Sequence, residues 1–460
     1  MSLNFSAFEI GRRALRANQF GIGVTGQNIA NVNTPGYSRR HVLLAETAPL
    51  DFGRNAVGSG VSVQGVQAFR DRFIETRIQS ELGIAGRLSA QRDTVSQIET
   101  TLQGTEGGGL QNALSSFFGS FRDLDANPNS VPLRAIAAQK GSALASTFQS
   151  TYAKLDNIRS GTDGQLRTAA NEVNALSQQI AELNSQIKNV INSGGEADNL
   201  KDQRGQLVNQ VAELTGARTT DNGDGTITLT IGEGRPLVSS DHAFEIEINN
   251  SPPLGLATLT LEGQPAIFDE GTIRGLQNAI LTTTDQLTSL DGLAAQVVQR
   301  VNALHTSGTD LDGNAGTNFF DATPPVTAAN ISINAAIVGN PRLVVASALS
   351  QPGQNGSIAG EIANLLTDPN TTVGSNTGSF SSIFGSLLSQ AGEQVNAAEN
   401  GLQTQAAIIA QATAQRESIS GVSLDEEAVN LLQYQKAYEA AARFLKVADE
   451  MTQTILSLAG

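Results

Sequence analysis

The side chains whose spacing best matches a known binding chemistry lie in the second half of the chain. Oxygen-bearing residues stand at the first, third, fifth and twelfth positions of a calcium-loop pattern, namely Asp310, Asp312, Asn314 and Asp321. The sixth position is Ala315, although a calcium loop needs glycine there, and the twelfth residue is not the usual glutamate. We therefore interpret the segment as a turn after a helix that ends near His305, and we predict that it holds no metal.

The other residue types that serve catalysis are too scattered to form a site. The three histidines, His41, His242 and His305, show no His-Glu-x-x-His pattern, and the chain has no Gly-x-Ser-x-Gly elbow. We expect each histidine at the surface or in a loop. The glycine run 107–109 lacks the lysine of a phosphate loop and predicts a hinge. The sequence therefore predicts no enzyme and no cofactor.

The composition narrows the class of protein further. A formal net charge of −15, without a long Lys/Arg-rich stretch, argues against a nucleic-acid partner. The absence of cysteine excludes disulfides and thiolate metal sites. No run reaches the roughly eighteen apolar residues that a membrane span needs, so we predict no membrane insertion. Residues 1–20 also lack the layout of a cleaved secretory signal peptide.

The most informative predicted helices lie at the two ends of the chain. Residues 424–458 contain neither proline nor glycine and predict a helix about 50 Å long. Ser423 and Glu426 before it form a capping-box pattern. Apolar residues recur at steps of three and four, as in a coiled-coil seam: Leu431, Tyr434, Tyr438, Ala441, Leu445, Ala448 and Ile455. We expect the partner of this seam to be the N-terminal segment or another molecule.

The N-terminal segment is a suitable partner for that helix. Residues 3–29 predict an amphipathic helix with apolar residues seven apart, at Phe8, Leu15, Ile22 and Ile29. Residues 1–40 contain five arginines against one glutamate, whereas residues 425–460 contain six acids against three bases. The opposite charges favour side-by-side packing, although exposed charges add little energy.

A turn follows the N-terminal helix. Thr34 precedes a proline and is therefore extended, and Pro35-Gly36 fits the two central positions of a type II turn. The plain interpretation is an ordinary connection between a helix and a strand.

The middle of the chain predicts long helices interrupted by one β-rich region. Helical periodicity marks residues 69–102, 110–124, 133–216, 273–304 and 380–420. The period changes to two between them, at residues 217–270. Residues 308–378 are rich in turn formers and fit either a second small insert or a loose connection.

The predicted fold is mainly α with β inserts. We expect a long, coiled-coil-like antiparallel helical bundle built from both chain ends, with a small β-rich domain that projects from it. The predicted terminal domain combines 1–45 with 421–460. The predicted long-helix domain combines 46–216, 271–307 and 379–420, and the two inserts are 217–270 and 308–378.

The two end motifs together resemble a known family. The segment from Asn33 to Arg39, Asn-Thr-Pro-Gly-Tyr-Ser-Arg, is similar to the N-terminal signature of the bacterial flagellar axial proteins. The segment from Ser423 to Arg443 is similar to their C-terminal signature. The helical middle, including 198–207, resembles the hook-associated members that join the hook to the filament.

This resemblance implies a structural subunit of the extracellular flagellum. It implies export through the flagellar type III apparatus without a cleaved signal peptide, and self-assembly into a tubular segment on the hook. Implied partners are the hook protein, a second junction protein, and an export chaperone on the C-terminal helix. We predict that the terminal helices order on polymerisation. The predicted subunit interface comprises Phe8, Leu15, Ile22, Ile29, Asn33, Thr34, Pro35, Gly36, Tyr37, Leu431, Gln435, Tyr438, Ala441 and Leu445.

Two alternatives remain at this point. Another axial protein, a hook or rod subunit, would share both end motifs but would carry mostly β domains in the case of a hook protein. An exported adhesin or enzyme would display its activity on the insert 217–270.

Overall fold

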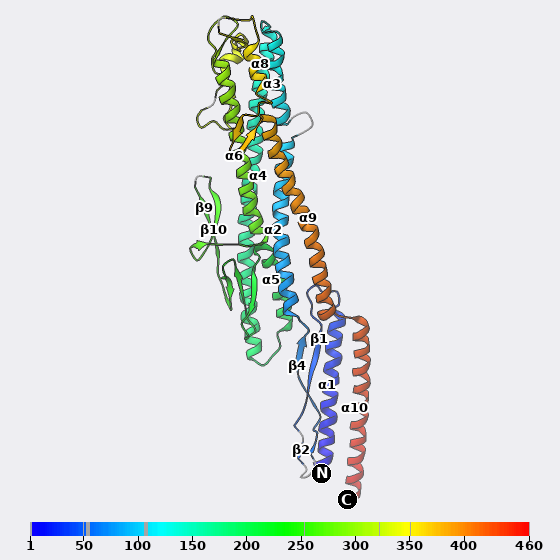
Figure 1. Ribbon diagram of the computed structural model, residues 1–460. Coiled ribbons are helices and arrows are strands. Elements are labelled where there is room, and N and C mark those ends of the chain that lie inside the picture. The colour runs from blue at the N-terminus through cyan, green and yellow to red at the C-terminus, as the bar shows by residue number, and fades with distance from the viewer. Residues whose placement is uncertain are drawn as a thin grey trace.

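The computed structural model is long and narrow, and both ends of the chain lie at the same end of the molecule (Figure 1). It describes residues 2–48, 50–51, 56–104, 109–252, 254–321, 323–349 and 351–459. The fold is mainly α with small antiparallel sheets, as the sequence predicts. Most of the predicted hinge at glycines 107–109 lies outside the described residues.

Long helices form the body of the molecule. They are α2 (Arg72–Gln103), α3 (Leu110–Ala126), α4 (Val131–Asn192), α5 (Asp198–Thr215), α6 (Gly271–Thr306) and α9 (Phe380–Ser420). Their ends follow from local chemistry. Asp71 and Ser130 accept backbone N–H groups at the starts of α2 and α4. Gly216 ends α5 in the left-handed conformation, with φ of +68°.

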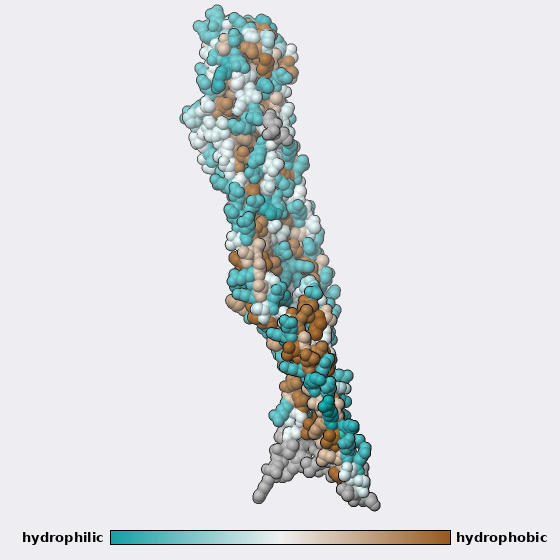
Figure 2. Space-filling view, turned by 90° about the vertical axis from the view of Figure 1, so that its right-hand side faces the viewer, coloured by the Kyte–Doolittle hydropathy of each residue, from teal (hydrophilic) through white to brown (hydrophobic). Residues whose placement is uncertain are grey.

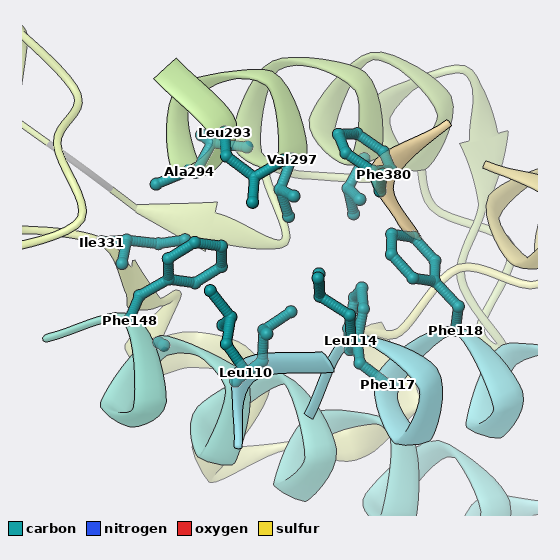
Figure 3. Packing of buried hydrophobic residues seen from close by; sticks show 14 of the residues in the cluster. Leu110, Leu114, Phe117, Phe118, Phe148, Leu293, Ala294, Val297, Ile331 and Phe380 are labelled. Carbon is teal, nitrogen blue, oxygen red and sulfur yellow. The ribbon is translucent and has the colours of Figure 1, made fainter. Parts of the chain in front are cut away.

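The main core lies at the end of the body away from the termini. Phenylalanines from three helices meet there, including Phe117 and Phe118 of α3, Phe148 of α4 and Phe380 of α9 (Figure 3). Phe117 and Phe118 are fully buried, and their ring centroids lie 5.0 Å apart. Such large buried rings contribute much of the stability of a core.

Residues 308–378 belong to this core and do not form a loose connection. Their short elements are β12 (Gly308–Thr309), β13 (Phe320–Asp321), β14 (Ser332–Ile333), α7 (Ala335–Gly339), η1 (Pro341–Leu343), β15 (Ser347–Ala348), α8 (Ser357–Asn364), β16 (Thr371–Val373) and β17 (Asn376–Gly378). Phe319 is fully buried, with its ring centroid 5.5 Å from that of Phe117. The region therefore caps the ends of α3, α4 and α6.

The β-rich insert forms two small antiparallel sheets beside α4. Its strands are β5 (Arg218–Asp221), β6 (Ile227–Ile231), β7 (Arg235–Ser239), β8 (His242–Ala243), β9 (Ile246–Ser251), β10 (Leu256–Leu261) and β11 (Gln264–Pro265). One sheet has the order β5-β6-β7-β8 and the other β11-β10-β9. The insert stands out sideways in Figure 1, while Leu229 and Ile231 on its inner face share a buried cluster with Val173 of α4.

A separate helical hairpin forms the other end of the molecule. It pairs α1 (Ser2–Ala30) with α10 (Leu424–Ala459). A two-stranded antiparallel sheet of β1 (Arg40–Glu46) and β4 (Val61–Ala68) lies beside α1, and β2 (Leu50–Asp51) pairs with β3 (Ala56–Val57). Of the described helices, not one combines the length and the apolar character that crossing a membrane requires.

Candidate functional site

Most of the predicted C-terminal seam faces the N-terminal helix, whereas its last member, Ile455, is 49% exposed. A Cβ atom on Gly11 would lie 2.6 Å from Leu445, and one on Gly21 would lie 2.6 Å from the ring of Tyr434. The two helices approach closely because glycine stands at these two positions. Ala441 is also almost fully buried on this face. The structure therefore confirms that the two chain ends pack side by side.

The predicted interface residues differ in how far this packing covers them. Partly buried positions in the two helices are Phe8, Leu15, Ile22, Ile29, Leu431 and Leu445. Gln435 and Tyr438, by contrast, are exposed. Gln435 therefore lies outside the intramolecular seam, and Tyr438 lies at its edge. Their role as contacts between subunits stays a prediction.

The turn after α1 has the predicted type II geometry. The backbone N–H of Tyr37 donates to the carbonyl of Thr34 at 3.2 Å, and Gly36 has a φ of +78°. Asn33, Thr34 and Pro35 are exposed at the tip of the turn. The turn is held on its inner side, because Arg416 of α9 donates to the carbonyl oxygen of Gly36 at 3.1 Å. Gln206 of α5 also donates to the carbonyl oxygen of Pro35.

A cluster of polar side chains joins the hairpin to the body at this turn. We call it the joint cluster, and it consists of Asn28, Arg39, Arg40, Arg70, Asp202 and Glu427. Asn28 is buried and uses its whole amide group. Its oxygen accepts from the Arg40 N–H at 3.1 Å and the Tyr37 hydroxyl at 2.9 Å. Its nitrogen donates to the Arg40 carbonyl at 2.9 Å and to Glu427 at 3.0 Å.

Two carboxylates carry the negative charge of the joint cluster, one buried and one partly buried. Glu427 of α10 is 2% exposed and accepts from Arg39 at 2.8 Å. Asp202 of α5 lies 2.9 Å from Arg40 and 2.7 Å from Arg70. Charges withdrawn from water persist only when they are paired and hydrogen-bonded, and both carboxylates meet that condition. The cluster therefore couples α1, α5 and α10, which are far apart in sequence.

Tyr37 completes this arrangement. Burial raises the pKa of its phenol above the usual value, although the nearby Arg40 opposes the shift. The hydroxyl therefore keeps its proton and donates to Asn28. The Arg40 guanidinium lies 4.8 Å from the centre of the Tyr37 ring, within the range of a cation–π contact.

The predicted capping box at the start of α10 is altered by the joint cluster. The Ser423 hydroxyl accepts from the Glu426 N–H at 3.5 Å, which is the long limit of a hydrogen bond. The Glu426 carboxylate lies 2.6 Å from Arg39, so this side chain forms an ion pair in place of the reciprocal cap. Sequence analysis did not predict this ion pair because Arg39 and Glu426 lie 387 residues apart.

Sequence reasoning did not single out Asn28, Asp202 or Glu427 as site residues. Glu427 is the third carboxylate in the first turn of α10, which suits a helix dipole and so concealed its pairing with Arg39. The opposite charge of the two chain ends was the one available signal for this contact.

The candidate calcium loop is a turn closed by its own side chains. The Asp310 carboxylate accepts from the N–H groups of Asp312 at 2.9 Å and Asn314 at 2.8 Å. Asp312 pairs with Arg342, which holds the pKa of Asp312 below its usual value. Among the described residues, no group of three or more His, Asp or Glu side chains is arranged to hold a metal ion.

The expectation that His305 is exposed is wrong. His305 is fully buried beneath residues 308–378, and its Nε2 accepts from the Val345 N–H at 2.9 Å. Its other ring nitrogen pairs with the carbonyl oxygen of Thr317. Burial lowers the pKa of His305 to about 4, so the ring is neutral. His242 is exposed as predicted, and His41 is partly buried, stacked on Phe69 with ring centroids 4.4 Å apart.

Families of known proteins match both the hairpin and the body of this chain. The flagellar hook-associated protein FlgK helical domain matches residues 95–320. The flagella basal body rod protein family matches residues 8–37, and the C-terminal domain of the flagellar basal body rod FlgEFG proteins matches residues 414–458. Flagellar hook-associated protein 1 of Bacillus subtilis is 28% identical, with 99% of each chain covered. Over almost its whole length the chain is therefore similar to flagellar hook-associated protein 1.

Two further proteins are similar to this chain. Flagellar hook-associated protein 1 of Salmonella typhimurium is 24% identical over 96% of this chain and 98% of its own. The structure of the flagellar hook junction protein FlgK from Burkholderia pseudomallei superposes with a TM-score of 0.65 at 14% identity. The superposition covers 75% of this chain and 100% of that chain, so the two proteins share a fold. The match to the FlgK helical domain, residues 95–320, includes the whole of α3, α4, α5 and α6.

Proposed function

We propose that this chain is a structural subunit of the bacterial flagellum that forms the junction between hook and filament. The observation that carries the proposal is the order of three family matches, with a terminal flagellar motif at each end and the hook-associated helical domain between them. Chemistry at a catalytic centre plays no part in this function. The extended helical body and the two-helix end are shapes that suit a building element.

The hairpin is the part through which the subunit assembles. The apolar side chains that its two helices bury most completely are small, as at Ala17, Val24, Ala441 and Ala448. Fixing the backbone of a residue costs roughly 1–2 kcal/mol, so a long hairpin with so little buried area gains from neighbouring subunits. Assembly then completes the burial of the hairpin and couples its ordering to incorporation.

The turn 33–37 and the joint cluster set the angle at which the hairpin leaves the body. Each subunit in a tube must present its body at the same angle, because a repeated contact between identical subunits requires identical geometry. The exposed side chains of Asn33 and Thr34 are then available to an adjacent subunit.

The partners that we propose are those of a junction in an exported structure. The hook protein lies on one side and a second junction protein on the other. Before export, a chaperone holds the C-terminal helix, whose apolar side chains would otherwise be open to solvent. The subunit passes through the flagellar type III apparatus without a cleaved signal peptide and functions outside the cell.

A gene deletion tests the proposed function directly. Cells that lack this chain should carry bare hooks and release unpolymerised flagellin, and the wild-type gene should restore filaments. Electron microscopy of the cells and immunoblotting of the medium measure both effects. Normal filaments on the deletion strain would exclude a role at the junction, whereas missing hooks would favour the alternative of a hook or rod subunit.

A double substitution tests whether the hairpin is the assembly element. Leu431→Asp with Leu445→Asp places two charges in the α1–α10 seam, and the variant should leave the body folded and fail to support filaments. Thermal unfolding of the purified chain checks the body. A matched control is Leu281→Asp on α6, where the side chain is 62% exposed, and this variant should support filaments. Intact filaments with the seam variant would contradict the proposal.

A further inference from the structure

A crevice lies between helices of the body, next to the joint cluster. The helices α5 and α9 both pack on α2, and the crevice between them is lined by Ile78 and Leu82 of α2. Its volume is about 550 Å³, and Pro35 and Gly36 of the turn line it as well. We call it the body crevice. Charge distinguishes it from the apolar surface that gathers where the body narrows into the hairpin (Figure 2).

Basic side chains outnumber acids in the lining of the body crevice. The four bases and two acids are Arg70, Lys201, Arg204, Arg416, Glu75 and Asp202. Both acids already have basic partners. Glu75 lies 2.7 Å from Arg416, and Asp202 is shared between Arg40 and Arg70, at 2.9 and 2.7 Å. The crevice therefore keeps a net positive charge in a chain whose formal net charge is −15.

Arg204 of α5 is a buried cation without a carboxylate partner among the described residues. It is 8% exposed, and its Nη1 donates to the Asn184 side chain at 2.6 Å and to the Gly225 carbonyl at 2.7 Å. Burial lowers its pKa to about 10, so the guanidinium stays charged at neutral pH. Asp221 opposes this shift, but it pairs with Arg72 at 3.1 Å. Because a charge withdrawn from water needs a counterion, the site favours an anion.

The open edge of the Arg204 guanidinium has the form of an oxyanion site. Its Nε and Nη2 lie on the same edge of the planar group and have no hydrogen-bond partner among the described residues. Neither atom is fully enclosed by protein, so both are open to the crevice. Two parallel N–H groups on one edge bind two oxygens of a carboxylate or a phosphate at once.

Gln79 of α2 adds a second buried donor. It is 7% exposed, and its Oε1 accepts from the Thr219 hydroxyl at 2.9 Å, whereas its Nε2 has no partner among the described residues. Thr219 of β5 and Ile227 of β6 line the crevice from paired strands. The Asn184 side chain accepts from both Ile227 and Arg204. Gln79 and Arg204 therefore approach the same end of the crevice from two helices.

Lys201 supplies a second positive charge on the same side. It precedes Arg204 by three residues in α5, so the two side chains lie on one face of the helix. Its ammonium lies 3.8 Å from Asp198, beyond hydrogen-bonding distance, and its side chain is 30% exposed. The lysine is therefore able to turn toward an anion at Arg204.

We propose that the body crevice binds an oxyanion, with Arg204 as its bidentate ligand and Lys201 and Gln79 as further donors. The oxyanion is a phosphate or a carboxylate, because each offers two oxygens to the guanidinium. A free anion and an acidic side chain of a neighbouring subunit share this chemistry. Either would join α2 to α5 beside the joint cluster and stabilise the folded body by binding. The site is independent of the proposed function, because all of its residues belong to one chain.

Titration of the purified full chain tests the site with two probes. One is inorganic phosphate, and the other is glutarate, a dicarboxylate that resembles the glutamate side chain. Isothermal titration calorimetry at constant ionic strength measures both affinities, with chloride as the control anion. At least one probe should saturate a single site at about 10 mM, and chloride should not. Tighter binding of phosphate would indicate a free anion, and tighter binding of glutarate an acidic side chain.

Variants show whether the anion lies at Arg204. Arg204→Lys keeps the positive charge but loses the paired N–H groups, and should weaken binding about tenfold. Lys201→Gln, at a partly exposed position, tests the site even if Arg204→Lys fails to fold, and should weaken binding about threefold. The matched control is Lys154→Gln, at an exposed lysine of α4 outside the crevice, and its affinity should equal that of the wild type.

Three results would overturn the proposal. The first is that neither phosphate nor glutarate gives saturable binding. The second is that binding survives unchanged in Lys201→Gln and in a folded Arg204→Lys variant. The third is an equal loss of affinity in Lys201→Gln and Lys154→Gln, which would indicate a general charge effect.

Discussion

The two ends of this molecule are built by opposite means. At the far end of the body, the side chains of Phe117, Phe118, Phe148 and Phe380 are fully buried and surround one another. In the hairpin, glycines bring two helices together, and large apolar side chains such as Leu432 and Met451 remain more than half exposed. The first end has completed its core within one chain, whereas the second leaves apolar area for other chains.

This difference shows which part of the subunit contributes most of its free energy of folding. Burying a large apolar side chain contributes about 1.5–3 kcal/mol, so the body holds most of the free energy of folding. A hairpin that formed an equally complete core would have nothing left to bury on assembly. The following predictions test this contrast, from the largest expected effect to the smallest.

Truncation in the body core should have the largest effect on stability. Phe117→Ala removes a fully buried ring that lies 5.0–5.5 Å from four others, and should lower the free energy of unfolding by about 3–5 kcal/mol. Phe73→Ala is the matched control, because that ring is 78% exposed. Its effect should stay within about 0.5 kcal/mol. Denaturant titration followed by circular dichroism measures both, and similar losses would contradict the assignment of the core.

Breaking the joint cluster should have the next largest effect. Asp202→Asn keeps the shape of the side chain but leaves Arg40 and Arg70 without their shared carboxylate. Because Arg40 is almost fully buried, the loss should be about 3 kcal/mol. Hydrogen exchange should show faster exchange in the turn 33–37 and at the start of α5.

A matched control for this substitution is Asp93→Asn. Asp93 pairs with Arg92, but its side chain is 57% exposed. Exposed ion pairs contribute about 0–1 kcal/mol, so this variant should be nearly as stable as the wild type. If Asp202→Asn were equally harmless, the joint cluster would not hold the hairpin to the body.

The buried histidine predicts a pH dependence that belongs to the body alone. Burial lowers the pKa of His305 to about 4, whereas the unfolded chain binds the proton near pH 6.5. The unfolded state therefore gains protons first, so stability is full above about pH 6.5 and falls as the pH drops toward 4. Between pH 7.5 and 5 the loss should be about 2 kcal/mol.

Comparison of variants isolates the contribution of this side chain. His305→Gln should remove most of the pH dependence in this window, while His242→Gln, at an exposed position, should leave it unchanged. Unfolding titrations at several pH values provide the measurement. A slope that survives in His305→Gln would assign the effect to other groups.

The sequence predicts the local elements of this fold well and its long-range contacts poorly. The helices at 2–30 and 424–459, and the type II turn at Pro35-Gly36, follow from periodicity and from residues next to one another. Residues within one helical turn determine such features, so they are visible in the sequence. Burial of His305 and the pairing of Glu427 with Arg39 depend on contacts made by distant segments. The period of a helix identifies an apolar face but does not say which partner covers it.

Replacing two glycines of α1 should give the smallest effects on stability, and these effects should have opposite signs. Both glycines lie in the same helix, but only one of them packs against α10. Gly21 lies against Tyr434, and an added methyl group would sit 2.6 Å from its ring. Gly26 has nothing within 4 Å of the same position. Replacement of a helical glycine by alanine stabilises a helix by about 1 kcal/mol when there is space. Gly26→Ala should therefore stabilise α1 by about that amount.

Gly21→Ala should have the opposite sign. The helix gains the same intrinsic term, but the methyl group forces the Tyr434 ring or the whole of α10 to move, and overpacking of this kind costs about 1–3 kcal/mol. A net loss of about 1 kcal/mol should appear as faster hydrogen exchange along α1. Adding Tyr434→Ala should remove the clash, so the double variant should lose less than the sum of the two single losses. If both alanine variants stabilised α1 equally, the seam would not be as close as the structure has it, and the hairpin would depend on neighbouring subunits even for its internal packing.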